Sequence, residues 1–356
     1  MIQQRAAGAI MGSLIGDALG LGCHWYYDLD EMRRDCGAWI DGYLAPRPGR
    51  YHGGMAAGEP SQSAILLRML LHSVLAHGEY SEADFTRRLD EDLFPQLDGT
   101  PFCGPGGYTN QSIREAWRCR VREGKSWQDC SGHADTTEGA ERAIVLAALH
   151  ARRPRRVAEA VSGHVALTQG DEAIIAMSTA YNIVLSQLIA GQRLGPDLVP
   201  ALLGLVHDGE LPFHAVTRQN LQPPGPGEGE APRAGTFASP DALLLPHYAA
   251  IAARDPGIRI EPAWKAALVY GLPCAIYQQL PAAYYLASRF ADDYESAVLH
   301  AINGGGQNMS RAMLTGALVG AQVGLDAIPR RFIDGLMDGE RLREEALALG
   351  ALAGRE

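Results

Sequence analysis

Five titratable side chains in this sequence stand beside glycine-rich segments or predicted helix starts: Asp17, His24, Glu59, His133 and Asp135. Their residue types suit transfer of a proton to or from a bound substrate. Asp17 lies in an apolar helical run, where a lone charge is costly, so it must be paired, hydrogen-bonded or functional. Glu59 comes just before a predicted helix start, where the helix dipole would keep its carboxylate ionised near neutral pH. Glu59 is therefore our first candidate for a general base.

The other groups also have ordinary structural interpretations. His24 suits an acid–base or ligand role, and equally a hydrogen-bonded core histidine. His133, Asp135 and Thr136 form a polar cluster before a predicted helix. The sequence Asp-Thr-Thr-Glu is also typical of a helix cap with acidic residues in the first turn. Both interpretations stay open at this point.

A possible anion site lies in the stretch NGGGQNMSRAMLTGALVGAQVG at residues 303–324. Three glycines followed by a helical run would gather unhindered N–H groups at a helix N-terminus, which favours phosphate. Together with polar residues of the motifs given below, the expected substrate- or phosphate-binding residues are Gln62, Asn303, Gly304, Gly305, Gly306, Gln307, Asn308 and Ser310.

Small residues recur every fourth position on two predicted helices, which places them on one face of each helix. They are Gly8, Gly12, Gly16 and Gly20 near the N-terminus and Ala312, Gly316, Gly320 and Gly324 near the C-terminus. We expect these helices to pack together and to bring both ends of the chain to one site. Tight packing alone would also explain the two stripes.

Composition excludes several classes of function. The 356 residues carry a formal net charge of -10, so the basic footprint of a nucleic-acid-binding protein is missing. Six scattered cysteines without a C-x-x-C pair argue against a zinc site and a disulfide framework, so we expect reduced thiols and a cytoplasmic location. The short apolar N-terminal run could pass for a signal peptide, but Asp17 within it favours a buried helix. No segment reaches ~18 uninterrupted apolar residues, so no membrane span is expected.

Helical periodicity recurs along the chain, and no stretch alternates convincingly with period two. We predict an all-α fold, one compact domain of about a dozen helices over residues 1–356. Residues 29–58 are expected to be irregular, with a pocket-lining loop around Tyr51 and His52, and residues 213–240 to form a Pro/Gly-rich lid or surface loop. The predicted helices cover residues 2–22, 61–77, 81–93, 109–122, 139–150, 154–167, 171–190, 195–206, 242 onward, 264–279, 292–302, 307–323 and 329–349.

These motifs, in this order, resemble the ADP-ribosylglycohydrolase superfamily, nearest the branch that includes the J1 crystallins. The resemblance covers nearly the whole chain. It implies an all-α fold and, in active members, removal of ADP-ribose from protein side chains or action on related ADP-ribosyl compounds at a two-magnesium site in a central cleft. The matching segments are GAIMGSLIGDALGLGCHWYYD at 8–28, the helix entrance at 58–71, TTEGAERA at 136–143, LTQGDEA at 167–173 and NGGGQNMSRAMLTGALVGAQVGLDAIP at 303–329.

The sequence departs from the family where magnesium would be held. By spacing, the family's Thr-Asp-Asp-Thr falls on Glu59, Pro60, Ser61 and Gln62, and its Asp-Thr-Asp-Thr falls on Gln307, Asn308, Met309 and Ser310. Gln62, the glycines and Asn308 match the crystallin-like branch, but none of the four expected aspartates is present. Because magnesium prefers carboxylate oxygens, we expect no magnesium pair and no other cofactor.

Two classes of function follow from the resemblance and its departures. The first is hydrolysis of an ADP-ribosyl, NAD-derived or other ribosyl compound without metals, with Glu59 as base, Asp17 or Asp135 as further carboxylates, and His24 or His133 assisting the leaving group. The second is a non-catalytic, crystallin-like binding or structural protein, or a pathway enzyme of another reaction class. The expected partner is a small ribosyl or ADP-ribosyl ligand, with no nucleic acid and no membrane.

Overall fold

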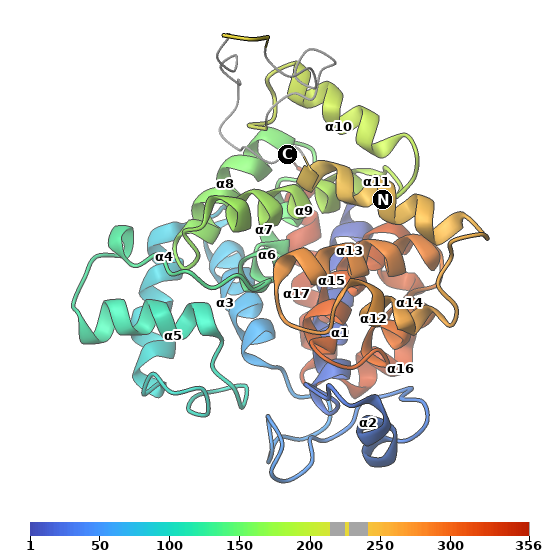
Figure 1. The fold of residues 1–356 in the computed structure, drawn as a ribbon. Coiled ribbons are helices and arrows are strands. Elements are labelled where there is room, and N and C mark those ends of the chain that lie inside the picture. The colour runs from blue at the N-terminus through green and yellow to red at the C-terminus, as the bar shows by residue number, and fades with distance from the viewer. Residues whose placement is uncertain (214–224, 228–240, 356) are drawn as a thin grey trace.

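The structure, a computed structural model, describes residues 1–213, 225–227 and 241–355 and consists of helices and their connections (Figure 1). These residues contain no strand, and isolated bridges join Gly132 to Gln169 and Thr136 to Ala275. The prediction of an all-α fold is confirmed. The α-helices are α1 (Ile2–Leu21), α2 (Leu29–Cys36), α3 (Gln62–His77), α4 (Glu82–Arg88), α5 (Gln111–Trp117), α6 (Glu138–Arg142), α7 (Ile144–Leu149), α8 (Pro154–Ala166), α9 (Glu172–Ala190), α10 (Leu198–His207), α11 (Asp241–Arg254), α12 (Ala266–Tyr270), α13 (Ile276–Arg289), α14 (Tyr294–Ile302), α15 (Asn308–Val323), α16 (Arg330–Gly335) and α17 (Gly339–Ala353).

The helices α1 and α15 cross at the centre, where the blue N-terminal helix lies among the orange and red C-terminal helices (Figure 1). A Cβ atom added at Gly8 would lie 2.2 Å from Gly320 O, and one at Gly12 would lie 2.2 Å from Gly316 O. Farther along, a Cβ at Gly20 would lie 2.5 Å from Met309 Cα. The two small-residue stripes therefore meet backbone to backbone in antiparallel order, as predicted, and bring the two ends of the chain together.

Burial is deepest along this central pair. Every residue of α1 from Ala6 to Leu21 is buried, and so is every residue of α15 from Asn308 to Gln322. Around them the hydrophobic core runs from α1 to α17. Among the described helices, α9 is the one long and apolar enough to cross a membrane by length and composition, and 72% of its apolar window is buried inside the protein. Such burial is typical of a core helix.

The structure differs from the sequence-based helix boundaries in several places, and the predicted helix at 139–150, for example, is divided into α6 and α7 at Ala143. Residues 29–58 contain α2, whose start is capped by Asp28, so the segment is not irregular throughout. The predicted helix at 264–279 is broken after Tyr270, where Gly271 has a φ of +129°, and α13 then continues to Arg289. The predicted helix at 329–349 is divided between α16 and α17 at Asp338, which has a φ of +60°. The expected loop at 213–240 lies almost entirely outside the described residues.

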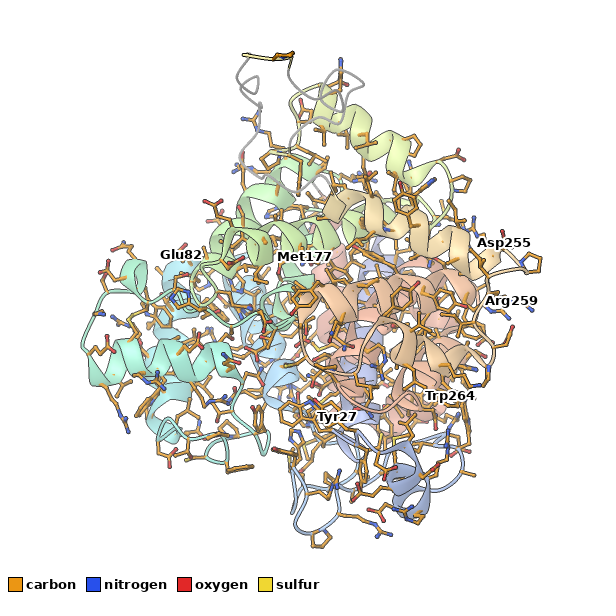
Figure 2. The ribbon with its side chains drawn as sticks, viewed as in Figure 1. Tyr27, Glu82, Met177, Asp255, Arg259 and Trp264 are labelled. Atoms are coloured by element: carbon orange, nitrogen blue, oxygen red, sulfur yellow. A yellow bond between two sulfur atoms is a disulfide. The ribbon has the colours of Figure 1, made fainter. Side chains whose placement is uncertain are left out.

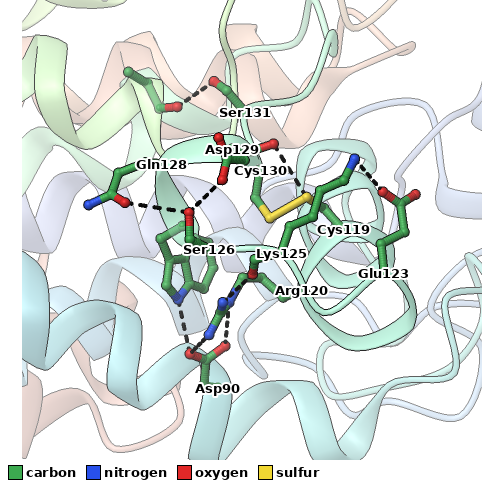
Figure 3. Close-up of a disulfide and its surroundings, with 12 residues drawn as sticks. Asp90, Cys119, Arg120, Glu123, Lys125, Ser126, Gln128, Asp129, Cys130 and Ser131 are labelled. Carbon is green, nitrogen blue, oxygen red and sulfur yellow. Dashed lines mark hydrogen bonds and ion pairs between the residues drawn. A yellow bond between two sulfur atoms is a disulfide. The ribbon is translucent and has the colours of Figure 1, made fainter.

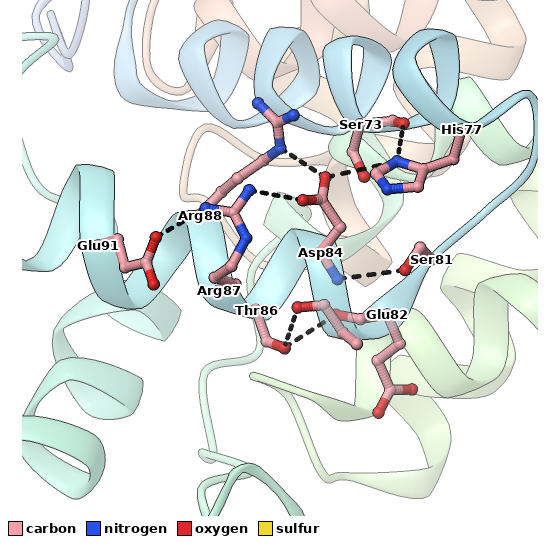
Figure 4. A network of polar contacts seen from close by, with 10 residues as sticks. Ser73, His77, Ser81, Glu82, Asp84, Thr86, Arg87, Arg88 and Glu91 are labelled. Atoms are coloured by element: carbon pink, nitrogen blue, oxygen red, sulfur yellow. Dashed lines mark hydrogen bonds and ion pairs between the residues drawn. The ribbon is translucent and has the colours of Figure 1, made fainter.

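A polar network fixes the corner between α3 and α4 (Figure 4). Ser81 caps α4 by accepting from the Asp84 N–H at 3.2 Å. The carboxylate of Asp84 accepts from Arg87 and Arg88, at 2.6 Å each. Both arginines lie on α4 itself, and the buried Asp84 reaches α3 through His77, whose Nδ1 lies 3.8 Å from Asp84 Oδ2.

The structure corrects the expectation that all cysteines are reduced. Cys119 and Cys130 form a disulfide with a Cα–Cα distance of 5.4 Å, which is within the usual range (Figure 3). The bond joins the π-helical turn at 118–122 to the segment that leads toward α6. Spacing alone did not reveal it because the two cysteines are 11 residues apart and outside any short motif. Since cytosolic proteins rarely contain disulfides, the cysteine pattern no longer supports a cytoplasmic location.

Candidate functional site

Asp17 is fully buried on α1 and faces the N-terminus of α3. Its Oδ1 accepts from Ser61 Oγ at 2.5 Å, and its Oδ2 accepts from the Ser61 N–H at 2.9 Å. Burial raises the pKa of Asp17 to about 7, although both hydrogen bonds from Ser61 lower it. Ser61 is also the N-cap of α3, accepting from the Ser63 N–H at 3.1 Å. The carboxyl group of Asp17 can thus exchange a proton near neutral pH. Both of its oxygens, however, are hydrogen-bonded to Ser61 and so connect α1 to the start of α3.

His24 and His52 form a buried pair, each 2% exposed. His24 Nδ1 lies 2.7 Å from His52 Nε2, and His52 Nδ1 lies 2.7 Å from Gly106 O. On its other side, His24 Nε2 lies 3.1 Å from Gln307 Oε1, and Gln307 Nε2 donates to Ser310 Oγ at 2.8 Å. Burial lowers the pKa of His24 well below its ordinary value, with the neighbouring His52 adding to the effect, and burial also lowers the pKa of His52. The sequence candidates His24 and Gln307 therefore do meet, in a network that includes a second histidine.

Trp25 connects this buried pair to an aromatic pocket of about 590 Å³. Its indole stacks on His24 with ring centroids 4.5 Å apart, and Tyr51 packs edge-on against the indole at 4.6 Å. Tyr51 also stacks on Phe102 at 5.7 Å. Tyr27, marked in Figure 2, is 53% exposed at the pocket. The residues that line the pocket are Trp25, Tyr27, Asp28, Glu31, Gly49, Arg50, Tyr51 and Phe102.

The charged side chains of this pocket are Arg50, Glu31 and Asp28. Arg50 Nη1 pairs with Glu31 Oε1 at 2.9 Å, and its guanidinium lies 3.6 Å from the centroid of the Tyr26 ring. Asp28 Oδ1 accepts from two backbone N–H groups of α2, and these bonds lower the pKa of Asp28. Glu31 is therefore the pocket carboxylate that has no backbone hydrogen bond to maintain.

The glycine segment before α15 is folded inward. The N–H groups of Gly305, Gly306 and Gln307 donate to backbone carbonyl oxygens at 3.4, 2.7 and 2.8 Å. Gly305 and Gly306 have φ values of +67° and +60°, and a Cβ at Gly306 would lie 2.5 Å from Leu272 O. The glycines thus allow a close approach between protein segments. In this fold the N–H groups of Gly305 and Gly306 are engaged within the protein and are not presented to an anion.

The two preceding residues also make internal contacts. Asn303 Oδ1 accepts from the Ile40 N–H at 2.9 Å, and its Nδ2 donates to Ile40 O at 2.8 Å. Gly304 lies against Ala267, whose Cβ would be 2.6 Å from an added Cβ. Asn303 therefore anchors the loop after α2 to the end of α14.

The predicted binding amides Gln62 and Asn308 are buried as well. Gln62 Oε1 accepts from the Asn110 N–H at 2.8 Å, and Asn308 Nδ2 donates to Cys23 O at 3.0 Å. Gln62 Nε2 and Asn308 Oδ1 have no hydrogen-bond partner. Each side-chain amide thus connects a helix N-terminus to a neighbouring loop through only one of its two polar atoms.

The remaining candidates lie away from the aromatic pocket's lining. Glu59 Oε2 accepts from the Ala56 N–H at 2.9 Å and so closes a turn of its own loop. Asp135 is exposed, and its Oδ2 accepts from the Tyr277 hydroxyl at 3.4 Å. His133 is also exposed. The structure therefore does not bring Glu59, His133 or Asp135 together with the pocket that contains Trp25.

The magnesium pair implied by the family resemblance does not fit the residues present. Gln307 Oε1 already accepts from the Trp25 indole and faces His24, and Met309 supplies a thioether rather than oxygen. No group of three or more His, Cys, Asp or Glu side chains that could hold a metal ion occurs in the described part of the chain. Because magnesium requires several oxygen ligands, the side chains at these positions do not make a site for a magnesium pair.

Sequence reasoning missed His52, Trp25 and Glu31 as site residues. It expected the loop around Tyr51 and His52 to line a pocket, but His24 and His52 are 28 positions apart and only the fold shows their contact. The density of aromatic residues in HWYYD at 24–28 and in YHGG at 51–54 was the available signal. Glu31 gave no signal, since it resembles any exposed helix glutamate.

The comparisons with known proteins agree with this architecture. The model of the ADP-ribosylglycohydrolase family matches residues 1–356. One of the solved structures that this chain resembles is an "ADP-ribosylglycohydrolase-related protein complex", with a TM-score of 0.63, 18% identity and coverage of 99% of each chain. At that identity the likeness shows the fold alone. None of the curated proteins matches the sequence.

Proposed function

Because this chain belongs to the ADP-ribosylglycohydrolase family, we propose that it hydrolyses the glycosidic bond of a small ADP-ribosyl, NAD-derived or related ribosyl compound without a magnesium pair. The observation that carries this proposal is the aromatic pocket, with Trp25 as one wall and Arg50 and Glu31 at its side. Its volume of about 590 Å³ is in the range typical of small-ligand sites.

The pocket offers one group for each part of such a ligand. A nucleobase presents a flat π face, which Trp25 and Tyr51 can bind by stacking or edge contacts. The Arg50 guanidinium is suited to a phosphate oxygen, because it is planar and always charged. Arg50 Nη1 pairs with Glu31 and Nη2 donates to Trp25 O, and each of these NH₂ groups has a second N–H for a ligand oxygen.

Hydrolysis of a ribosyl bond requires a carboxylate near the sugar. As the bond breaks, positive charge develops on the ribose, and a water molecule attacks the anomeric carbon. Glu31 is paired with Arg50 and partly exposed, so its carboxylate is placed to stabilise that charge and to take a proton from the water. Neither step needs a metal ion.

Glu59 remains the competing base, as expected from the sequence. The observation that supports Glu59 as the base is its position two residues before the N-cap of α3. Against it, its Oε2 already accepts from the Ala56 N–H at 2.9 Å. Glu31 lies on α2 and Glu59 lies in the loop before α3, so the roles of the two glutamates can be separated by mutation.

A specific observation favours binding without catalysis as the second candidate function. The polar groups of the family motifs are committed internally: Asp17 to Ser61, His24 to His52 and Gln307, and the N–H groups of Gly305 and Gly306 to carbonyl oxygens. If Glu31 does not act as a base, the pocket remains a nucleotide-binding surface on a fold without a working acid–base pair.

Variants of the two glutamates test the proposal. The protein is incubated in EDTA with ADP-ribose, NAD, ADP-ribosyl-arginine and nucleosides, and products are followed by liquid chromatography and mass spectrometry. We expect Glu31→Gln to lower turnover by about 10²–10⁴-fold with ligand binding largely kept. Glu159→Gln is the matched control, because Glu159 is an exposed helix glutamate paired with Arg155. Equal turnover by Glu31→Gln and the parent would exclude Glu31, and a loss in Glu59→Gln alone would assign the base to Glu59.

A further inference from the structure

A chain of hydrogen bonds runs from Gly106 through His52, His24 and Gln307 to Trp25. The two ends of this chain have fixed roles. The carbonyl oxygen of Gly106 can only accept, and the indole N–H of Trp25 can only donate. The roles of the three side chains between them then follow from the number of protons that they carry.

With both histidines neutral, the assignment starts at Gly106. His52 Nδ1 must carry a proton to donate to the carbonyl, so His52 Nε2 is bare and accepts from His24 Nδ1–H. His24 Nε2 is then bare too, and it faces Gln307 Oε1 at 3.1 Å. Two acceptors are opposed at that contact, which is repulsive.

Rotation of the Gln307 amide by 180° does not remove the conflict. The amide NH₂ would then donate to His24 Nε2, but the same atom also faces the Trp25 indole N–H. Two donors would be opposed there instead. Every neutral arrangement of this chain therefore contains one mismatched contact.

One added proton satisfies all of the contacts. If His24 carries protons on both ring nitrogens, it donates to His52 Nε2 and to Gln307 Oε1, and Gln307 also accepts from Trp25. We propose that His24 and His52 hold one proton more than the neutral pair in the arrangement with Trp25 bound to Gln307, and that loss of this added proton releases the Trp25 indole from Gln307. His24, His52 and Gln307 are then positioning residues for one wall of the aromatic pocket.

Of the residues in this chain of hydrogen bonds, Trp25 can give up its hydrogen bond at the lowest cost in free energy. His24 and His52 are each 2% exposed, whereas Trp25 is only partly buried and lines the pocket. Its N–H can bind water or a ligand oxygen after release, but a buried imidazole nitrogen cannot. The freed Gln307 can rotate, donate to His24 Nε2, and accept from the Ser310 hydroxyl, which is able to reverse its role.

The charged and titratable groups around the pair do not supply a compensating anion. From the loop before α3, Arg50 donates to Trp25 O at 3.3 Å and is paired with Glu31 of α2. At the end of α1, Asp17 is paired with Ser61, and burial raises the pKa of the Cys23 thiol to about 12, so that thiol stays neutral.

On the remaining sides, Tyr108 places its ring 6.3 Å from His52, and Arg311 of α15 donates to Ala301 O and Gly305 O. With no carboxylate facing it, the proton on the pair is disfavoured by burial, which lowers the pKa values of both histidines. The transition therefore falls below the ordinary histidine range, and Trp25 is released at neutral pH and held in acid.

This inference rests on the proposed function only in treating Trp25 as a wall of the ligand pocket. Its test uses ligand-free protein, so its failure and the failure of the proposed hydrolysis can be told apart. The indole N–H resonances of ¹⁵N-labelled protein are followed by NMR from pH 8 to pH 4.5, with the Trp25 signal assigned by its loss in Trp25→Phe. Trp117 is an internal control, because its Nε1–H donates to Phe94 O at 3.2 Å and contacts neither histidine.

We expect the Trp25 indole resonance to move as pH falls through one protonation step while the Trp117 resonance stays fixed. Gln307→Leu removes the acceptor, so the Trp25 resonance should be independent of pH in that variant. Gln307→Glu provides an acceptor that also pairs with the imidazolium, so the step should reappear at higher pH. A Trp25 resonance that is constant over the range, or that titrates equally in Gln307→Leu, would overturn the proposal.

Discussion

Replacing Gly12 by alanine tests the backbone contact between α1 and α15 that organises the fold. Alanine is the better helix former by about 1 kcal/mol, so an isolated helix would gain stability. In this protein the new Cβ would lie 2.2 Å from Gly316 O and 2.9 Å from Gly316 C. Ordinary contact requires about 3.5 Å, so the helices would have to separate by roughly 1 Å.

That separation would strain the neighbouring contacts of the same stripe and the hydrogen bond from the Tyr294 hydroxyl to Gly12 O at 2.8 Å. Overpacking of a well-packed core costs about 1–3 kcal/mol, and here the opposing atoms are backbone, which cannot move aside as a side chain does. With the cost at the upper end of that range and the helix-propensity gain of about 1 kcal/mol subtracted, we expect Gly12→Ala to lower the free energy of unfolding by about 2 kcal/mol.

The assay is urea unfolding followed by circular dichroism, with the midpoint compared at unchanged slope. Gly163→Ala on α8 is the matched control, because Gly163 is also a helical glycine but has nothing within 4 Å of an added Cβ. We expect that control to raise the midpoint. If Gly12→Ala is as stable as Gly163→Ala, the backbones of α1 and α15 are not in close contact at Gly12.

Three further perturbations have defined outcomes. Burial raises the pKa of Asp17 from its ordinary value of 3.8 to about 7, so the folded state binds this proton more tightly than the unfolded state does. The stability that protonated Asp17 contributes is therefore complete below about pH 4 and is lost as the pH rises to about 7. Asp17→Asn, which can still accept from the Ser61 N–H and can donate to Ser61 Oγ, should remove that part of the pH dependence; an unchanged dependence in urea midpoints measured from pH 4 to pH 8 would contradict it. Cys119→Ser should destabilise the protein by about 3 kcal/mol through loss of a short closed loop, and the unreduced, unfolded parent should titrate four thiols rather than six. Gly305→Val places a β-branched residue at a φ of +67° and should lower the urea midpoint even without ligand, whereas an unchanged midpoint would show that the segment tolerates a Cβ.

The fold could be predicted well because its signals are periodic. Small residues at every fourth position of α1 and α15 identified the central pair, and the helical period identified most of the remaining helices. The incorrect helix predictions lie where a capping residue or a glycine overrides the helical periodicity. Asp28 caps α2 within a segment rich in turn residues, and Gly271 interrupts an otherwise helical run.

The candidate site was harder to predict because its contacts join distant parts of the chain. Asp17 and Gln307 were identified as polar residues in motifs, but their partners Ser61 and His24 could only be found in three dimensions. The glycine run was a sound indicator of close backbone approach, yet it could not show whether a ligand or a carbonyl oxygen would face its N–H groups. Similarly, Glu138 resembled an ordinary first-turn acid of its own helix, whereas its carboxylate accepts from two backbone N–H groups at the start of α5.

The central claim is that the aromatic pocket binds a ribosyl ligand and that its glycosidic bond is cleaved without a magnesium pair. The most direct measurement is product formation by metal-stripped protein in EDTA, compared between the parent and Tyr51→Ala, which opens the pocket at a side chain that is 37% exposed. We predict that the parent releases product from at least one ADP-ribosyl, NAD-derived or ribosyl compound in EDTA, and that Tyr51→Ala needs more substrate for the same rate. Turnover that appears only when magnesium is added, or that is identical in Tyr51→Ala at every substrate concentration, would contradict it.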